Sequence, residues 1–327
     1  MIKTKKKIVM LFPCVGRRVA LLKLFRRASS RLGCRSVFIG SDVTEHAAAL
    51  QCCNRKYLVK PVTHRRYREQ MLEIIRQEKV DLIVPTVDLD LPVWAELRES
   101  LARNGCTALI STPNVVRICQ DKRLMFRFLK KHGFDTPQTM TVAQARKLTR
   151  HRFPYFLKPW DGYAGRGSYL ARNREELQFF SRRVPNCIVQ EFIDGDEHTV
   201  DVLVDFNGRV RCVVPRRRLQ VRSGEVSKAL TVKHPLIMQR SKKLVETLGA
   251  GPGIVTIQCF LTRKNEIKFI EINPRFGGGI PLSIQAGADF PRWLLQLWLG
   301  KMPRIKPDGW RDNLLMLRYD DAIWVQK

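Results

Sequence analysis

The sequence lacks several features that mark common protein classes. No apolar stretch approaches the roughly 20 residues that a membrane-spanning helix requires. The nine cysteines show no Cys-x-x-Cys spacing, and Cys52 and Cys53 are adjacent, which argues against a zinc site and against a small disulfide-linked fold. There is no internal repeat and no low-complexity segment. We therefore expect a soluble, cytoplasmic protein whose thiols are free.

The N-terminus could be mistaken for a secretion signal. Residues 3–7 are rich in lysine and precede the apolar run Ile8–Phe12. That run stops at Pro13, has no small-residue cleavage site and leads into Arg17 and Arg18. It is better interpreted as a first buried strand than as a leader.

Acidic residues are scarce. The chain has 30 Asp and Glu residues against 59 Lys and Arg residues, a formal net charge of +29. Such a field attracts anions, whether they are nucleotides, nucleic acids or membranes. The basic residues are spread along the chain with only short clusters, such as 5–7 and 216–218, whereas a nucleic-acid-binding module usually concentrates them on one element. This pattern favours a basic surface around a site that handles polyanions, and it argues against a dedicated nucleic-acid-binding protein.

What the sequence does contain is a clear alternation of strands and helices over residues 1–112, which is typical of a Rossmann-like parallel α/β sheet. In such a sheet, ligands bind beyond the carboxyl ends of the strands. The residues at those ends are Gly16 to Arg18, Ser41 and Asp42, and Thr86 to Asp90. The expected strands are 8–12, 36–41, 57–59, 81–85 and 108–110, and the expected helices are 19–31, 46–52, 67–78 and 91–104.

The rest of the chain has a different pattern. A helix is expected at 120–132, and from Phe153 onward short strands, glycine loops and hairpins indicate an α+β fold with antiparallel sheets. Residues 314–325 are expected to form a closing strand. We therefore predict three parts: an α/β domain at 1–112, a small subdomain with a phosphate loop at 113–187, and a larger subdomain with a metal site at 188–327.

A candidate metal site lies in a predicted hairpin over residues 254–273. Glu271 and Asn273 point to the same face of one strand because side chains alternate, and the hairpin would bring Gln258 beside them. One carboxylate and two amide oxygens suit Mg²⁺, which takes few protein ligands and shares the rest with phosphates. The polar face of an exposed hairpin would explain Gln258 but not the run into Arg275, a cation of the kind that a transferring phosphoryl group needs.

Two weaker patterns precede this hairpin. Lys158 ends an apolar strand, and the glycine-rich loop 160–168 follows it, with backbone N–H groups that could wrap phosphates. The segment 188–197 is extended and apolar, so its backbone could hold an adenine base and Glu197 the ribose hydroxyls. A plain hairpin or a strand and turn explains either pattern equally well, and the loop lacks the Gly-Lys-Ser/Thr ending of a Walker A motif.

In this order and spacing, the three patterns together resemble the ATP-grasp superfamily, in particular its stand-alone carboxylate–amine ligases similar to the carbamoyl phosphate synthase large subunit. The resemblance covers essentially the whole chain and is most specific over residues 257–260 and 269–275. It implies a pre-ATP-grasp α/β domain followed by an α+β ATP-grasp fold of two subdomains.

The resemblance also implies roles for particular residues. Gln258, Glu271 and Asn273 would hold two Mg²⁺ ions, with Mn²⁺ as an alternative. Arg275 and Lys158 would act on the transferring phosphoryl group and on an acyl-phosphate intermediate. ATP would be bound by Lys122, Lys158, Gly162, Gly165, Gly167, Ser168, Gln190, Glu191, Ile193 and Glu197.

Candidate substrate residues come from the strand ends and from the basic segment 216–228, which faces the reacting phosphates in this superfamily. The arginines after the first strand suit a carboxylate, and Asp88 after the fourth strand suits an amine. A solvated charge run, or helix capping for Asp88, explains each residue individually. The full candidate set is Arg17, Arg18, Asp88, Arg216, Arg222, Lys228 and Gly278.

The function that the resemblance implies is ATP-dependent ligation, in which a substrate carboxylate is activated as an acyl phosphate and passed to an amine or another nucleophile. The partners would be small carboxylates and amines, and a homodimer is an expectation because dimers are common in the resembling family. Two alternatives stay open: phosphorylation of bicarbonate or carbamate, and a basic nucleic-acid-binding protein without turnover. No second arginine follows Arg275 closely, since residues 276–279 are apolar or glycine, and this weakens the case for bicarbonate.

Overall fold

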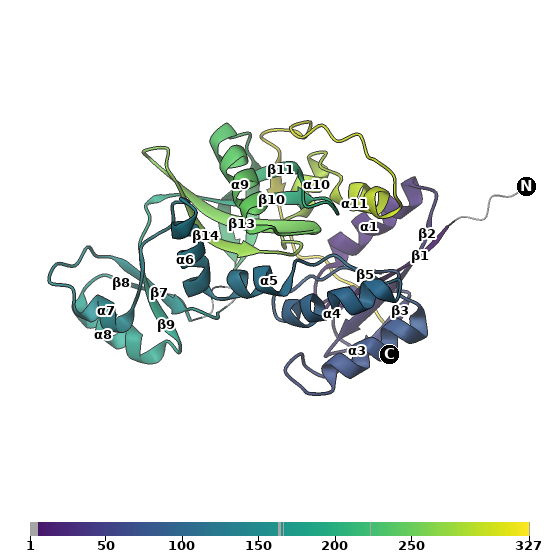
Figure 1. Cartoon of the computed structure of the whole chain (residues 1–327), viewed down its shortest axis with the longest axis horizontal. Coiled ribbons are helices and arrows are strands. Elements are labelled where there is room, and N and C mark those ends of the chain that lie inside the picture. The colour runs from purple at the N-terminus through teal and green to yellow at the C-terminus, as the bar shows by residue number, and fades with distance from the viewer. Residues whose placement is uncertain (1–5, 163–164, 166, 223, 327) are drawn as a thin grey trace, which may run out of the picture.

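The computed structural model describes residues 6–162, 165, 167–222 and 224–326 (Figure 1). Its first part is a five-stranded sheet of order β3-β2-β1-β4-β5, in which every neighbouring pair of strands is parallel. The predicted Rossmann-like sheet is therefore confirmed. The strands are β1 (Lys7–Phe12), β2 (Arg35–Asp42), β3 (Arg55–Leu58), β4 (Leu82–Ile83) and β5 (Thr107–Ala108).

The sheet is covered on both faces, which explains why β1 is an unbroken apolar run. Ile8, Met10 and Phe12 lie in one core cluster, and Val9 and Leu11, which point the other way, lie in another. Helices α1 (Val19–Arg31) and α2 (Ala48–Gln51) supply the first cluster, and α3 (Tyr67–Glu78) and α4 (Leu91–Arg103) supply the second.

The second part begins with two helices where the sequence predicted one. Helix α5 (Pro113–Gln120) ends before Asp121, and α6 (Lys122–Lys131) begins after it. Asp121 has an extended backbone, and its carboxylate accepts hydrogen bonds from the backbone N–H groups of Arg123 and Leu124. This N-cap separates the helices, and periodicity alone does not reveal it.

A small antiparallel sheet of order β6-β9-β7-β8 follows, packed against two helices. Its last strand in the chain is β9, so the predicted boundary at residue 187 falls at the first residue of that strand. The elements are β6 (Thr139–Thr141), α7 (Val142–Arg146), β7 (Tyr155–Pro159), β8 (Tyr169–Ala171), α8 (Arg174–Arg183) and β9 (Cys187–Glu191).

The third part is a six-stranded sheet of order β14-β13-β10-β11-β12-β15, with α9 packed on one face. Its neighbouring strands are antiparallel. Its elements are β10 (Gly195–Val204), β11 (Val210–Arg222), β12 (Glu225–Thr231), α9 (Pro235–Leu248), β13 (Gly253–Thr262), β14 (Ile267–Asn273), α10 (Pro281–Gln285), α11 (Phe290–Trp298) and β15 (Leu315–Leu317).

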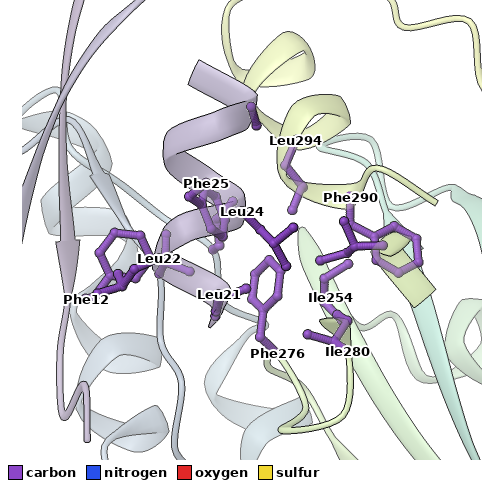
Figure 2. Close-up of a cluster of buried hydrophobic side chains, with 14 of the residues drawn as sticks. Phe12, Leu21, Leu22, Leu24, Phe25, Ile254, Phe276, Ile280, Phe290 and Leu294 are labelled. Atoms are coloured by element: carbon purple, nitrogen blue, oxygen red, sulfur yellow. The ribbon is translucent and has the colours of Figure 1, made fainter. Parts of the chain in front are cut away.

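One hydrophobic core joins the N-terminal sheet to the large sheet. Leu21 and Phe25 of α1 pack against Phe276 and Ile280, in the loop that follows β14, and against Leu294 of α11 (Figure 2). The rings of Phe25 and Phe276 meet edge to face with their centroids 5.5 Å apart. This shared core fixes the loop after β14 against the carboxyl end of the first sheet.

The expected closing strand is much shorter than predicted. Within the expected strand at 314–325, only β15 forms sheet pairs, with residues 228–230 of β12, and the chain beyond β15 is irregular. The side chains of Tyr319 and Trp324 are 83% and 91% exposed, so this segment buries too little apolar surface to continue the sheet. None of the helices in the described ranges has the length and apolarity needed to cross a bilayer.

Candidate active site

A cavity of about 760 Å³ lies where the three parts of the chain meet. Its walls come from the loops after β1 and β4, from β7 and β9 of the small sheet, and from β10, β11, β13 and β14 of the large sheet. Seventeen of the predicted site residues line it: Arg18, Asp88, Lys122, Lys158, Gly162, Gly165, Ser168, Gln190, Glu191, Ile193, Glu197, Arg216, Gln258, Glu271, Asn273, Arg275 and Gly278.

The predicted hairpin of β13 and β14 brings three polar side chains together in this cavity. Gln258 is the cross-strand partner of Glu271, and Thr256 is that of Asn273. A bulge between Gln258 and Cys259 leaves Ile270 without a partner, so Ile270 and Glu271 both line the cavity although they are adjacent in the chain. Bulges of this kind re-aim side chains, and they are common beside active sites.

Across the described residues, no three His, Cys, Asp or Glu side chains form a metal-binding group. A cation at Glu271 would therefore depend on the amide oxygens of Gln258 and Asn273 and on ligands from a bound phosphate. This donor set of one carboxylate and two amides fits Mg²⁺, which seldom has an all-protein cage, and it does not fit zinc.

Arg275 is held at both ends. Its Nε and Nη2 atoms donate to the two carboxylate oxygens of Asp88, at 2.9 and 2.7 Å, and its Nη1 donates to the carbonyl of Phe276 at 3.2 Å. Its own carbonyl accepts a hydrogen bond from the Thr256 hydroxyl at 3.0 Å. Burial lowers the pKa of Arg275, but the charge and hydrogen bonds of Asp88, together with the charges of Glu271 and Glu225, raise it by more, so the guanidinium stays charged.

The bidentate ion pair of Arg275 with Asp88 bears on the two roles that the sequence suggested for Asp88, helix capping and amine binding. Asp88 does not cap α4, and it does not lie free for an amine, because both of its oxygens bind Arg275. The loop that carries Asp88 is itself fixed, since Gln120 Nε2 donates to the Asp88 carbonyl at 2.6 Å. The N-terminal lobe thus orients the guanidinium of Arg275, which follows β14.

A buried hydrogen-bond network around Asp201 stabilises the loop after β14. Arg216 donates to both oxygens of Asp201, at 2.8 and 3.1 Å, and the hydroxyls of Ser283 and Thr256 lie 2.6 and 3.5 Å from them. A Cβ at Gly279 would overlap the Arg216 guanidinium, so glycine is required at that position. Arg216 is 1% exposed, and its contribution to the cavity is to position the loop after Arg275.

The two predicted lysines converge on the small-sheet side of the cavity. Lys122 Nζ donates to the carbonyl of Gly162 at 2.5 Å, which ties α6 to the glycine-rich loop. Lys158 is 9% exposed, and burial lowers its pKa to about 8, with Glu271 opposing this shift and Lys122 adding to it. The lysine lacks an ion-pair partner among the described residues, which leaves its charge available to an anion in the cavity.

The segment after β9 forms the opposite end of the cavity. Gln190 is buried and donates to the Thr139 hydroxyl at 2.9 Å, and the Glu191 carboxylate accepts from the backbone N–H of Gln138 at 3.0 Å. Both side chains therefore fix the segment. Five apolar side chains also line the cavity and are called the apolar slot below: Phe156, Phe192, Ile193, Phe260 and Ile270.

Arg218 is a cavity residue that the sequence analysis missed. It donates to Glu197 at 2.5 Å, while burial raises the pKa of Glu197 against the opposing effect of this arginine. Its neighbour Arg217 points away and pairs with exposed Asp196. The two-residue repeat of β11 was the signal available: a strand that turns Arg216 inward also turns Arg218 inward.

Four predicted residues lie outside the cavity lining. Arg17 is 77% exposed and only approaches Glu225, at 3.8 Å, while Arg18, at 3.3 Å from the same carboxylate, is 19% exposed and lines the cavity. Arg222 pairs with Asp320 on the surface. The other two, Lys228 of β12 and Gly167 of the glycine-rich loop, are also absent from its walls.

Two known domain families match this chain. Residues 119–279 match the ATP-grasp domain, and residues 10–109 match the PylC-like N-terminal domain. The carbamoyl phosphate synthase large chain of Gemmatimonas aurantiaca is 24% identical over 279 residues, which is 78% of this chain and 25% of that protein. A carbamoyl-phosphate synthase of Methanobrevibacter smithii is 22% identical over 63% of this chain and 60% of its own length. The chain thus spans about a quarter of the first relative.

Solved structures with the same fold include carboxylases and a ligase. The biotin carboxylase domain of the Hydrogenobacter thermophilus 2-oxoglutarate carboxylase superposes with a TM-score of 0.76 at 19% identity, over 94% of this chain and 73% of that one. L-Amino acid ligase from Bacillus licheniformis gives a TM-score of 0.71 at 20% identity, over 93% and 78% of the two chains. These similarities confirm the predicted fold.

Proposed function

We propose, from the premise that this chain belongs to the ATP-grasp superfamily, that it is an ATP-dependent carboxylate–amine ligase. The observation that carries the proposal is a single cavity with two lysines, one carboxylate between two amides, and one oriented arginine. These groups are Lys122, Lys158, Glu271 with Gln258 and Asn273, and Arg275. They are the groups that phosphoryl transfer needs, because its barrier is lowered mainly by positioning and by charge.

The nucleotide and the metal ions are assigned to neighbouring parts of this cavity. We assign the base to the apolar slot beside Gln190, the ribose to Glu197, and the phosphates to the two lysines and the glycine-rich loop. Two Mg²⁺ ions, with Mn²⁺ as an alternative, are assigned to Glu271 and its amide neighbours. Mg²⁺ would neutralise phosphate charge there. In the solved biotin carboxylase domain named above, the bound ligands are MgADP, ADP and bicarbonate.

The proposed reaction has two steps. A substrate carboxylate oxygen attacks the γ-phosphorus of ATP, the bond to the ADP oxygen breaks, and an acyl phosphate forms. The amine nitrogen then attacks the acyl carbon, phosphate leaves with the electrons of the C–O bond, and the amine proton passes to phosphate or solvent. Negative charge gathers on the phosphoryl oxygens in both steps, and Lys158 and Arg275 would stabilise it.

The carboxylate substrate is assigned to the basic end of the cavity. Arg18 lies there over Gly278, where a Cβ would come within 2.8 Å of its Nη1. Thr256, Arg18 and Arg216 pack closely against the glycines at 277–279, so this loop presents its backbone and the Arg18 guanidinium to the cavity. The proposal includes a cytoplasmic homodimer that acts on small molecules. All nine cysteines lie in described residues and are free thiols.

The direct test is to measure substrate-dependent ADP release with hydroxylamine as a trap. Small carboxylates and amino acids are offered with MgATP and hydroxylamine, which intercepts an acyl phosphate as a hydroxamate. We expect hydroxamate and ADP to form together with at least one carboxylate. If no carboxylate stimulates ADP release, while the chain binds a generic duplex with strong salt dependence, the nucleic-acid alternative replaces this proposal.

Nucleotide binding is expected to depend on pH through Lys158. In the protein without nucleotide, Lys158 has a pKa of about 8, and bound phosphates would stabilise its protonated form. Affinity is therefore full below pH 8 and falls as the pH rises, by roughly tenfold between pH 7 and pH 9. Titration of MgADP by calorimetry checks this. Lys158→Arg keeps its charge over this range, so its affinity should be flat, and an equal decline in both proteins would contradict the assignment.

A further inference from the structure

A second cavity, of about 690 Å³, lies between the end of β14 and helices α4, α5 and α6. Its walls are formed by α4, α5 and the start of α6, by Trp160 and Asp161 of the glycine-rich loop, and by the end of β14. The proposed reaction has so far used only the first cavity. ATP, its metal ions and the acidic substrate are all assigned to the first cavity, and no site has yet been assigned to the amine.

The two cavities share a wall at the reacting groups. Asp88, Lys122, Glu271 and Asn273 line both of them. A ligand in the second cavity therefore lies next to the residues that also line the first. A nucleophile bound there would be close to an acyl phosphate held by Lys158 and Arg275.

The two cavities differ in charge. The first is lined by six cations against five carboxylates: Arg18, Lys122, Lys158, Arg216, Arg218 and Arg275, against Asp88, Glu191, Glu197, Glu225 and Glu271. The second is lined by five carboxylates against two cations, the reverse of a chain that has 59 basic and 30 acidic residues. The carboxylates are Asp88, Glu96, Asp121, Asp161 and Glu271, and the cations are Arg117 and Lys122. Asp88 is paired with Arg275 and Asp121 with Arg123, so the carboxylates that can receive a positive charge are Glu96, Asp161 and Glu271.

The remaining walls of the second cavity are apolar. Leu91, Val116 and Leu124 come from three different helices, and Trp160 closes one side. The Trp160 ring is itself held by Arg123, whose guanidinium lies 3.7 Å from the ring centroid and pairs with Asp121 at 2.7 Å. An apolar body with one positive group matches this lining, because the walls bury the body and the carboxylates receive the charge.

We propose that the second cavity binds the amine substrate, an ammonium compound with an apolar side chain, and delivers it to the reacting groups at Glu271. The inference rests on the proposed ligase function. The acidic and the amino substrate are then bound in separate, adjacent cavities, and this keeps them apart before ATP is used.

Binding of three probes to the MgADP-bound chain tests the inference. n-Hexylamine, n-hexanol and n-hexanoate have the same apolar body with a positive, a neutral and a negative end. We expect hexylamine to bind at least about tenfold more tightly than hexanol, and hexanoate not to bind this cavity. Equal affinity for hexylamine and hexanol would overturn the proposal, because the cavity would then be only an apolar space.

Two variants locate the binding. Leu124→Trp fills the second cavity and should weaken hexylamine binding at least about tenfold, while MgADP affinity is unchanged. Arg127→Trp is the matched control, since Arg127 is exposed on the same helix and outside both cavities. Glu96→Gln combined with Asp161→Asn should reduce hexylamine affinity toward that of hexanol. Unchanged affinity in both Leu124→Trp and the double variant would overturn the proposal.

Kinetics separates a failure of this inference from a failure of the ligase proposal. Hydroxylamine is small enough to reach an acyl phosphate past a tryptophan at residue 124. We expect Leu124→Trp to keep hydroxamate formation and the KM for ATP, while the KM for the amine rises at least about tenfold. If wild-type protein forms no hydroxamate, the ligase proposal fails. If both proteins form it and the KM for the amine is unchanged, only the cavity assignment fails.

Discussion

Replacing Glu271 with glutamine is expected to abolish ATP turnover while leaving the fold intact. Glu271 is the single carboxylate among the three proposed metal-binding side chains, and glutamine has the same shape without the charge. It is half-buried at the cavity, where its cross-strand partner is another polar residue, Gln258. ADP release with the best carboxylate found, together with the temperature of thermal unfolding, measures the two effects.

Glu266→Gln is the matched control for this variant. Glu266 lies at the turn of the same hairpin, is exposed, and pairs with Lys268 at 3.6 Å outside the cavity. It should retain wild-type turnover and a wild-type unfolding temperature. A Glu271→Gln protein that releases ADP at the wild-type rate would show that the metal lies elsewhere.

Arg275→Ala is expected to lower kcat by roughly 10²–10³ with nucleotide affinity changed less than twofold, because the guanidinium acts mainly on charge that develops during transfer. The structure adds a condition to this expectation. Asp88 binds the guanidinium through two hydrogen bonds from a lobe that is 187 residues away in the chain. Asp88 is thus a positioning residue, and its removal should lower kcat through Arg275.

A double-mutant cycle measures this dependence. Asp88→Asn keeps the size of the side chain and is expected to lower kcat roughly tenfold, while the KM for ATP is unchanged. In the Arg275→Ala background the same change should have no further effect, because the group that Asp88 orients is gone. If the two losses multiply, Asp88 acts independently of Arg275, and the positioning role is wrong.

The same pair shows how the three parts of the chain cooperate. Thr256 of the large sheet fixes the Arg275 backbone, and Asp88 of the N-terminal sheet fixes its side chain. The Phe25–Phe276 contact places the intervening loop between them (Figure 2). A change in the packing of the N-terminal lobe is therefore expected to displace the Arg275 side chain before it displaces the residues of the apolar slot.

Much of the fold could be predicted from sequence where one element carries its own signal. Helices α1 and α3 begin and end at the predicted residues, because their apolar spacing and flanking turns are local. The β13–β14 hairpin was predicted with its cross-strand pair of Gln258 and Glu271, since a short turn leaves few registers. The two lysines, the glycine-rich loop and the segment 188–197 were selected through the resemblance, and the structure brings residues of all of them to one cavity.

Other features were predicted poorly because they depend on partners that are distant in sequence. The helix expected at 120–132 is present as α6, which begins after the Asp121 cap, but α5 before it was not predicted. The expected strand at 314–325 shrinks to three residues because the chain beyond β15 buries little apolar surface. Arg17 and Arg18 are equivalent in the sequence. Only the packing of α1 against the large sheet turns Arg18 into the cavity and leaves Arg17 in solvent.

The sequence alone determined the superfamily, the order of the elements and the chemical types of the reacting groups, because each depends on the spacing of residues within a single strand, loop or helix. Tertiary structure decided which charges are free to act. Asp88 is used by Arg275, Arg216 is buried under Gly279, and Lys158 remains unpaired with a lowered pKa. The physical reason is that burial and ion pairing are set by side chains far apart in the chain, 187 positions for Arg275 and Asp88 and 207 for Arg18 and Glu225, and such contacts leave no periodic trace in the sequence.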